Sequence, residues 1–175
     1  ILDIPADAVL NQNGTGFSGE VQISAYSLNP GFLEGLQRMP SDFKGITTVA
    51  NEKLLESFGV FLFDWSDLNN QKLTIVPGKK VTMKFPISNG VGAQVSSPLG
   101  LWYFDVAANT WKEEGTATLQ NGNYVAEIGV TGFWNIAIPH DFISVKGVLK
   151  NQSDEILSNM PFNIEIENGG VLGYG

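Results

Sequence analysis

A single imidazole and the absence of thiols limit the chemistry open to this chain of 175 residues. His140 is the only histidine and there is no cysteine. The sequence therefore lacks a Cys/His zinc site, a cysteine nucleophile and a redox dithiol. A serine triad would have to use His140, which follows Pro139, and no Gly-x-Ser-x-Gly elbow is present to hold a serine. We expect His140 to lie in an exposed loop, outside any catalytic centre.

Carboxylates offer a second kind of chemistry, glycoside hydrolysis, which needs two of them about 5–10 Å apart across a bound sugar. Glu113 and Glu114 are adjacent, so in a strand they point to opposite faces and cannot form such a pair. Asp105 with Glu113 is the remaining combination. We expect both to flank a hairpin that faces solvent, and we predict no catalytic residue.

Two loops resemble ligand sites. Residues 64–70 carry several oxygen-bearing side chains that could hold Ca²⁺, but the spacing is not that of an EF-hand, and a turn between strands also favours Asp and Asn. Residues 14–19 match the Gly-x-Gly-x-x-Gly dinucleotide fingerprint, but the residues after them read as a strand where a helix is needed. We predict no cofactor and no metal, and calcium at 64–70 stays an alternative.

The four tryptophans raise the question of sugar binding, because a flat indole can stack on a pyranose ring. Trp65, Trp102, Trp111 and Trp134 each lie in or beside an apolar stretch. A buried indole with its N–H hydrogen-bonded is the usual outcome in such a stretch. We therefore predict that they belong to the core, and a glycan platform of one or two of them is the alternative.

Composition excludes several partners. Ten basic and eighteen acidic residues give a net charge of −8, which provides no basic footprint for nucleic acid or anionic lipid. With 43% hydrophobic and only 16% charged residues, the chain is expected to be globular. It contains no run of eighteen apolar residues, so we expect no membrane insertion of this segment.

Period-two alternation dominates the sequence and predicts strands that face water on one side. Two further stretches, 59–65 and 101–105, are apolar on both faces and are expected at the centre of a sheet. Helix is expected only at 30–37 and, as an alternative to a strand, at 51–58. The alternating strands lie near 21–25, 81–85, 124–130 and 162–166, and turn signals fall at 13–14, 77–78, 89–90, 121–122 and 168–169.

Many short strands joined by Gly/Asn turns predict an all-β fold, an antiparallel β-sandwich of Greek-key type. We assign this sandwich to residues 1–140. Strands expected at 143–150 and 161–167, followed by a Gly-rich end, indicate the opening of a second, truncated sandwich over residues 141–175. Because the first residue is Ile1 and no leader precedes it, we expect a mature or excised piece of a longer chain.

Residues 101–105 (Leu-Trp-Tyr-Phe-Asp), 111–115 (Trp-Lys-Glu-Glu-Gly) and 132–135 (Gly-Phe-Trp-Asn) form a recognisable series. This series resembles the β-sandwich modules of bacterial cell-surface lipoproteins and the related region of cartilage intermediate layer proteins. The resemblance covers roughly residues 1–140. Distant relatives cleave themselves at a His-Phe-Ser tripeptide, but this chain has Thr131-Gly132-Phe133 at that place. Self-cleavage is therefore not expected.

The tail, from Val145-Lys146-Gly147-Val148 to Phe162-Asn163-Ile164, looks like the start of a carboxypeptidase-regulatory-like domain of transthyretin type. Both resemblances imply a non-catalytic extracellular module of a surface-anchored bacterial protein, whose parent is anchored in the outer membrane or lies in the periplasm. Such a module would mediate adhesion, presentation or protein contact, with an unknown protein or glycan as partner. A carbohydrate-binding module is the alternative function, and a hydrolase using Asp105/Glu113 or His140 is a third.

Overall fold

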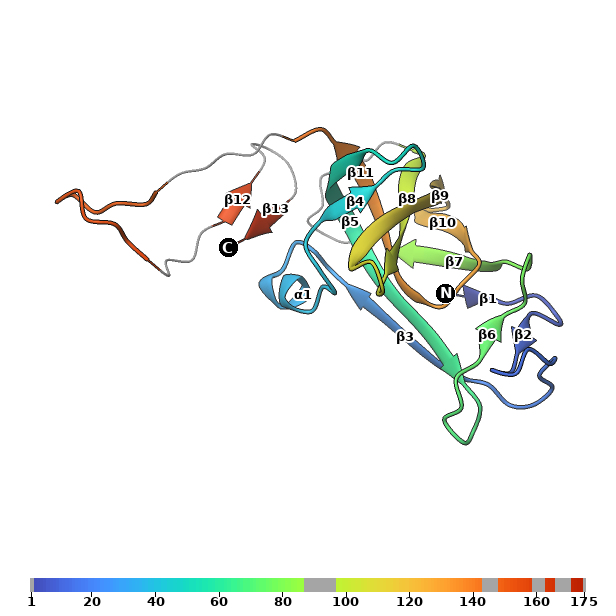
Figure 1. Cartoon of the computed structure of the whole chain (residues 1–175). Coiled ribbons are helices and arrows are strands. Elements are labelled where there is room, and N and C mark those ends of the chain that lie inside the picture. The colour runs from blue at the N-terminus through green and yellow to red at the C-terminus, as the bar shows by residue number, and fades with distance from the viewer. Residues whose placement is uncertain (1, 87–96, 143–147, 159–162, 166–170, 175) are drawn as a thin grey trace.

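The computed structural model describes residues 2–86, 97–142, 148–158, 163–165 and 171–174, and it is nearly all β (Figure 1). This confirms the predicted fold class. No helix in the described part of the chain is long and apolar enough to cross a membrane. The elements are β1 (Leu2–Asp3), β2 (Val9–Leu10), β3 (Gln22–Leu28), α1 (Leu33–Gln37), β4 (Lys44–Ile46), β5 (Glu52–Ser66), β6 (Thr74–Ile75), β7 (Val81–Pro86), β8 (Leu99–Asp105), β9 (Thr110–Gln120), β10 (Asn123–Ile128), β11 (Gly132–His140), β12 (Asn163–Glu165) and β13 (Val171–Tyr174).

Nine strands form one continuous sheet that folds over on itself into two layers. One layer is β1-β7-β10, and the other contains β5, β11 and β8 with β3 and β4 along the far side of β5. The long strand β9 belongs to both layers, because its last residues pair with β10 and its earlier residues pair with β8. Pairing is antiparallel except between β4 and β9, which run parallel for a short stretch.

The layer that contains β5 has a hydrophobic cluster on each face. The first core cluster fills the space between the two layers, with side chains from β5, β7, β8, β10 and β11. The second core cluster lies on the opposite face of β5, β8 and β11 and is covered by Leu36 and Phe43. The stretches 59–65 and 101–105 therefore have apolar neighbours on both sides, as their sequence predicted. The second cluster contains Leu28, Leu36, Phe43, Leu55, Val60, Trp102, Phe104, Trp111 and Ala137.

Alternation predicts burial correctly where both layers are present. In β7, Val81, Met83 and Phe85 point inward, and in β10 Tyr124 and Ala126 do the same. The strand predicted near 21–25 exists as β3, but its expected burial is wrong.

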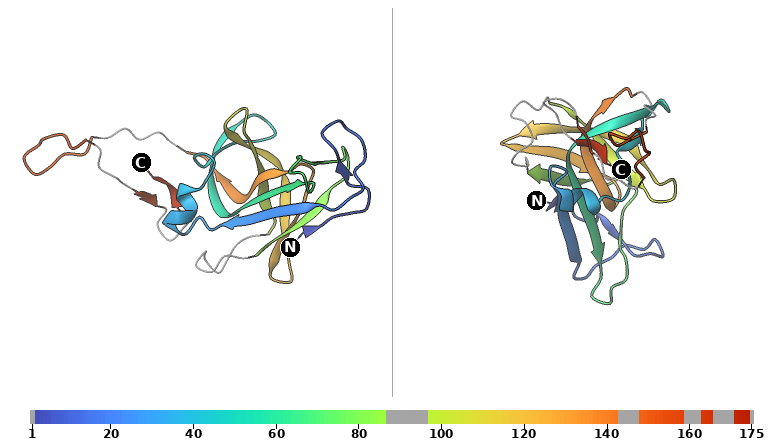
Figure 2. Two further views of the ribbon diagram at one scale, coloured as in Figure 1. Left: turned by 90° about the horizontal axis from the view of Figure 1, so that it is seen from below. Right: turned by 90° about the vertical axis from the view of Figure 1, so that its left-hand side faces the viewer.

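Six of the seven residues of β3, Gln22 to Ser27, are exposed although the strand has the expected alternation, and only Leu28 is buried. Ile23 and Ala25 lie opposite the buried residues Trp65 and Phe63, on the same face of the sheet. Nevertheless Ile23 remains 47% exposed, and Ala25 is exposed as well. β3 is an edge strand, visible beside the long β5 in Figures 1 and 2. Its side chains lack the opposing layer that buries their neighbours in β5.

Several predicted turns are present. Asn121 and Gly122 both have positive φ and connect β9 to β10 in a two-residue hairpin, and Gly78 has a φ of 84° in the turn before β7. The expected turns at 89–90 and 168–169 contain residues outside the described part of the chain. The helix expected at 30–37 is the short α1. The alternative helix at 51–58 is wrong, because those residues belong to β5.

The region after residue 141 contains β12 paired with β13, and an isolated bridge between Lys150 and Ile156. Of the strand expected at 143–150, residues 143–147 lie outside the described residues, and Val148 and Leu149 are not in a strand. The boundary at 140/141 and the second sandwich stay predictions.

Candidate functional site

All four tryptophans are interior residues, at most 2% exposed. Two of them pack edge-to-face on phenylalanine rings: Trp111 on Phe104, with 5.1 Å between ring centroids, and Trp65 on Phe63. Trp134 Nε1 donates to the carbonyl of Val130 at 3.2 Å. Their burial confirms the core assignment, and none of the four provides a flat exposed platform for a sugar. The hydrogen bond expected for a buried indole is not found for Trp65 and Trp102, whose Nε1 atoms have no partner among the described residues.

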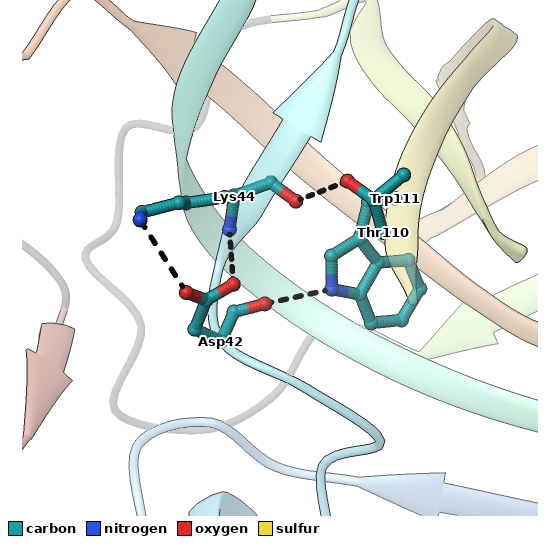
Figure 3. A network of polar contacts seen from close by, with 4 residues as sticks. All are labelled: Asp42, Lys44, Thr110 and Trp111. Atoms are coloured by element: carbon teal, nitrogen blue, oxygen red, sulfur yellow. Dashed lines mark hydrogen bonds and ion pairs between the residues drawn. The ribbon is translucent and has the colours of Figure 1, made fainter. Parts of the chain in front are cut away.

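A polar network around Trp111 connects the region of β4 to β9, as Figure 3 shows. Trp111 Nε1 donates to the main-chain carbonyl of Asp42 at 3.1 Å. The Asp42 carboxylate accepts the Lys44 N–H at 3.3 Å, and Thr110 Oγ1 donates to the Lys44 carbonyl at 3.4 Å. These bonds connect β4 to β9, so the polar atoms around Trp111 serve the fold.

The carboxylates of the hydrolase alternative lie on opposite faces of one sheet. Asp105 pairs with Thr110 and Glu113 pairs with Trp102, so along β8 their partner positions are three residues apart. Positions an odd number apart face opposite ways in a strand. Asp105 and Glu113 therefore cannot hold a sugar between them.

Each of these two carboxylates already has a local structural role. Asp105 forms an ion pair with Lys112 and accepts the N–H groups of Ala107 and Ala108 at 2.9 and 3.0 Å. The Lys112 hydrogen bond, followed by that from Ala108, holds the pKa of Asp105 below its usual range. Glu113 accepts the Thr48 N–H at 3.1 Å.

His140 is the last residue of β11, opposite Leu54 of β5, so the expectation of a loop position is wrong. Its Nε2 lies 2.8 Å from Oε2 of Glu56, which is largely buried. The neighbouring residue Asp141 forms an ion pair with Lys53. The strand pairing of β5 and β11 accounts for both contacts, because it brings the two strand ends together.

The oxygen atoms of loop 64–70 close a turn. Asp67 Oδ1 accepts the N–H groups of Asn69 and Gln71, each at 2.8 Å. Asn151 accepts the corresponding N–H groups of its own loop through a neutral amide. The described residues contain no group of three or more His, Asp or Glu side chains arranged to hold a metal ion. Residues 14–19 lead into β3, not into the helix that a dinucleotide site requires.

A hollow lined by exposed aromatic residues lies between the end of β3 and α1. We call it the β3–α1 rim and define it by Tyr26, Asn29, Phe32, Glu34 and Arg38, which line a depression of about 180 Å³. Tyr26 and Phe32 are 47% and 63% exposed, whereas the rings of the two core clusters are buried. The neighbouring Leu33 is 64% exposed, which extends the apolar surface along α1.

Arg38 contacts two other residues of the rim. Its Nη2 lies 2.8 Å from Oε1 of Glu34, and its Nη1 donates to the Tyr26 hydroxyl at 2.6 Å. The guanidinium carbon stands 5.7 Å from the centroid of the Tyr26 ring, within the range of a cation–π contact. The rim therefore presents two exposed aromatic rings and an arginine that is hydrogen-bonded to one of them and ion-paired with Glu34.

Buried neighbours determine where α1 lies. Leu28 and Leu36 flank the rim and are both buried in the second core cluster. Gly35 approaches the chain so closely that a Cβ there would lie 2.0 Å from the Asn29 carbonyl oxygen. A larger residue would displace α1 from β3. The rim is thus built on the core, although the helix has only five residues.

Sequence reasoning did not single out any residue of the rim. Two signals could have done so: Arg38 is the only arginine, and no charged residue occurs between Glu20 and Glu34 in an otherwise acidic chain. Comparison of the chain with family models, curated proteins and solved structures finds no match.

Proposed function

We propose that this chain is a non-catalytic binding module of a surface-anchored bacterial protein and that it contacts a protein partner through the β3–α1 rim. The observation that carries the proposal is the pair of exposed rings, Tyr26 and Phe32, that line one depression with Arg38, whose guanidinium contacts Tyr26. Aromatic residues and arginine are enriched at protein interfaces relative to the rest of the protein surface. The extracellular location rests on the resemblance of residues 101–135 to lipoprotein modules.

The non-catalytic part of the proposal is supported by the use of the reactive side chains. Asp105 and Asp67 accept main-chain hydrogen bonds within their own turns, and Glu113 accepts one from Thr48 in a distant segment. His140 and Glu56 contact each other at the ends of paired strands. These contacts position loops and strands, and a fold contact is a sufficient reason for each of them.

A carbohydrate is the second candidate ligand. Because the tryptophans are buried, its proposed binding site is the β3–α1 rim. Tyr26 and Phe32 are exposed aromatic faces, and Asn29, Glu34 and Arg38 place hydrogen-bonding groups around them. Few polar groups around an aromatic surface are typical of small-ligand sites. The depression of about 180 Å³ would accommodate part of a sugar unit.

Binding of the chain to the surface of whole cells distinguishes these functions. The folded chain is labelled and its binding is quantified by flow cytometry, for the parent sequence and for the double variant Tyr26→Ala/Phe32→Ala. We expect the double variant to bind at least about tenfold more weakly, because the two rings are the main apolar area of the rim. Its melting temperature should match that of the parent, since both rings are exposed. Val106→Ala, at a 76% exposed position remote in sequence, is the matched control.

Pre-treatment of the cells separates the two ligands. Loss of binding after protease treatment supports a protein partner. A saturable calorimetric titration with a polysaccharide that is abolished by Tyr26→Ala supports the glycan instead. Unchanged binding by the double variant would contradict the assignment of the rim to either ligand.

A further inference from the structure

We propose that two copies of this chain associate by antiparallel pairing of their β3 strands about a two-fold axis at Ala25, which joins the two β5 layers into one continuous sheet. The inference concerns the backbone of β3 at the edge of the sheet and goes beyond the proposed function. It does not depend on which ligand the β3–α1 rim binds.

The edge strand β3 carries none of the features that usually protect such strands from pairing with another chain. Among the described strands it pairs with β5 alone. Proteins normally protect edge strands with charged residues, proline or bulges, or keep them very short, because unpaired N–H and C=O groups can pair with another strand. The seven residues Gln22–Leu28 contain no charge and no proline, and their register with β5 is regular.

The backbone direction along β3 follows from its partner in β5. The Trp65 carbonyl accepts the Leu73 N–H at 3.1 Å, so the polar backbone of Trp65 points away from β3. Ile23 lies directly opposite Trp65. In an antiparallel pair that is not mutually hydrogen-bonded, both residues turn their N–H and C=O outward. Ile23, and by the period of two also Ala25 and Ser27, therefore direct their N–H and C=O groups to the side of β3 on which no described strand pairs with it.

These three residues are self-complementary. An axis at Ala25 places Ala25 opposite Ala25 of the second copy and Ile23 opposite Ser27 of the second copy. Every outward backbone group then meets an outward backbone group, and about six hydrogen bonds form between the strands. On the other face the same register places Tyr26 opposite Ser24 of the second copy. Each large side chain thus faces a small one, which avoids collision across the axis.

The absence of charged side chains at this edge strand favours self-association there. The chain carries a net charge of −8, so two copies repel each other over most of their surfaces. Residues 21–33 contain no charged side chain. At the edge formed by β3, two acidic chains can approach each other without bringing carboxylates of this segment into contact. Ile23, 47% exposed in the single copy, would become covered by the second copy.

Sedimentation velocity over a range of concentrations tests the proposal. We expect the parent chain to show a concentration-dependent dimer, and Ala25→Lys to raise its dissociation constant at least about tenfold, because a lysine pair at the axis adds repulsion. Ala25→Pro should act similarly by removing an outward N–H that β5 does not use. Val106→Lys, at another exposed apolar position, should leave the dimer unchanged.

Cysteine cross-linking supplies a second readout, since the chain has no cysteine of its own. Directly opposed residues in such a pair have Cα atoms about 5.5 Å apart, within disulfide range. Ala25→Cys should therefore form a disulfide-linked dimer on mild oxidation faster than Val106→Cys. A parent chain that stays monomeric at all concentrations, a dimer that Ala25→Lys leaves intact, or equal cross-linking of the two cysteine variants would each overturn the proposal. A monomer that still binds cells through the rim would leave the proposed function intact.

Discussion

The indole nitrogen of Trp111 donates a hydrogen bond to the main-chain carbonyl of Asp42, 3.1 Å away, in the interior of the protein. Trp111 is fully buried, and its ring packs on Phe104. The bond joins β9 to the chain just before β4, segments nearly seventy residues apart. A residue type that first suggests a sugar platform is therefore a connection between two parts of the core.

Replacing Trp111 tests this connection. Trp111→Ala should lower the free energy of unfolding by about 3–5 kcal/mol, because it leaves a cavity in the second core cluster. Trp111→Phe should cost about 1–3 kcal/mol, since it keeps much of the ring but leaves the Asp42 carbonyl unpaired. Urea unfolding gives both values. Phe32→Ala, at a 63% exposed ring, is the control and should change stability by less than about 0.5 kcal/mol. A Trp111→Ala variant as stable as that control would contradict the burial.

Asp67 should stabilise its loop as a hydrogen-bond acceptor and not as a calcium ligand. Asp67→Ala removes the acceptor of two main-chain N–H groups and should cost about 1–2 kcal/mol. Asp67→Asn keeps an acceptor oxygen and should retain most of the stability. Calcium and a chelator should leave the melting temperature of the parent unchanged. A calcium-dependent rise in melting temperature that is lost in Asp67→Asn would instead establish a calcium site.

Asp105 should contribute to the loss of stability in acid. The Lys112 hydrogen bond lowers the pKa of Asp105 in the folded chain, so the ionised carboxylate adds stability above its usual pKa of about 3.8. This stability is lost as the pH falls through the lower, folded pKa. Asp105→Asn, which keeps the turn acceptor, should therefore show a shallower decline in unfolding free energy below about pH 5. Asp7→Asn is the control at another exposed turn. Identical acid profiles for the parent and Asp105→Asn would contradict the assignment.

Gly35 should be required for the position of α1. Its Cβ position lies 2.0 Å from the Asn29 carbonyl oxygen, so Gly35→Ala forces the backbones apart and should cost about 1–3 kcal/mol. Gly16→Ala is the matched control, because nothing lies within 4 Å of its Cβ position and its φ is not positive. Hydrogen exchange should show faster exchange across α1 only in the first variant. Equal stability of the two variants would mean that α1 does not depend on this contact.

The sequence predicted the parts of the fold in which a local pattern coincides with tertiary burial. In β7 and β10 the alternation of apolar and polar residues matches the observed burial, because an opposing layer covers the apolar face. Asn121-Gly122 was predictable as a hairpin because both residues accept positive φ. In these elements each residue needs only its sequence neighbours to specify its environment.

The elements that were predicted wrongly depend on distant neighbours. Ile23 has the pattern of a buried residue, but its exposure depends on β3 extending beyond the opposite layer. Residues 51–58 carry apolar residues at helical spacing, yet pairing with β11 makes them part of β5. The β3–α1 rim arises when Arg38 folds back on Tyr26, twelve residues earlier. No local periodicity indicates such a contact.

Quenching of tryptophan fluorescence by acrylamide and iodide tests most directly the claim that the aromatic residues form the core and leave binding to the rim. Trp65, Trp102, Trp111 and Trp134 are all at most 2% exposed. We predict an emission spectrum shifted to the blue and little quenching in the folded chain, with full quenching only after unfolding in urea. A class of tryptophan that is quenched by iodide in the folded chain would contradict the account and restore the indole platform.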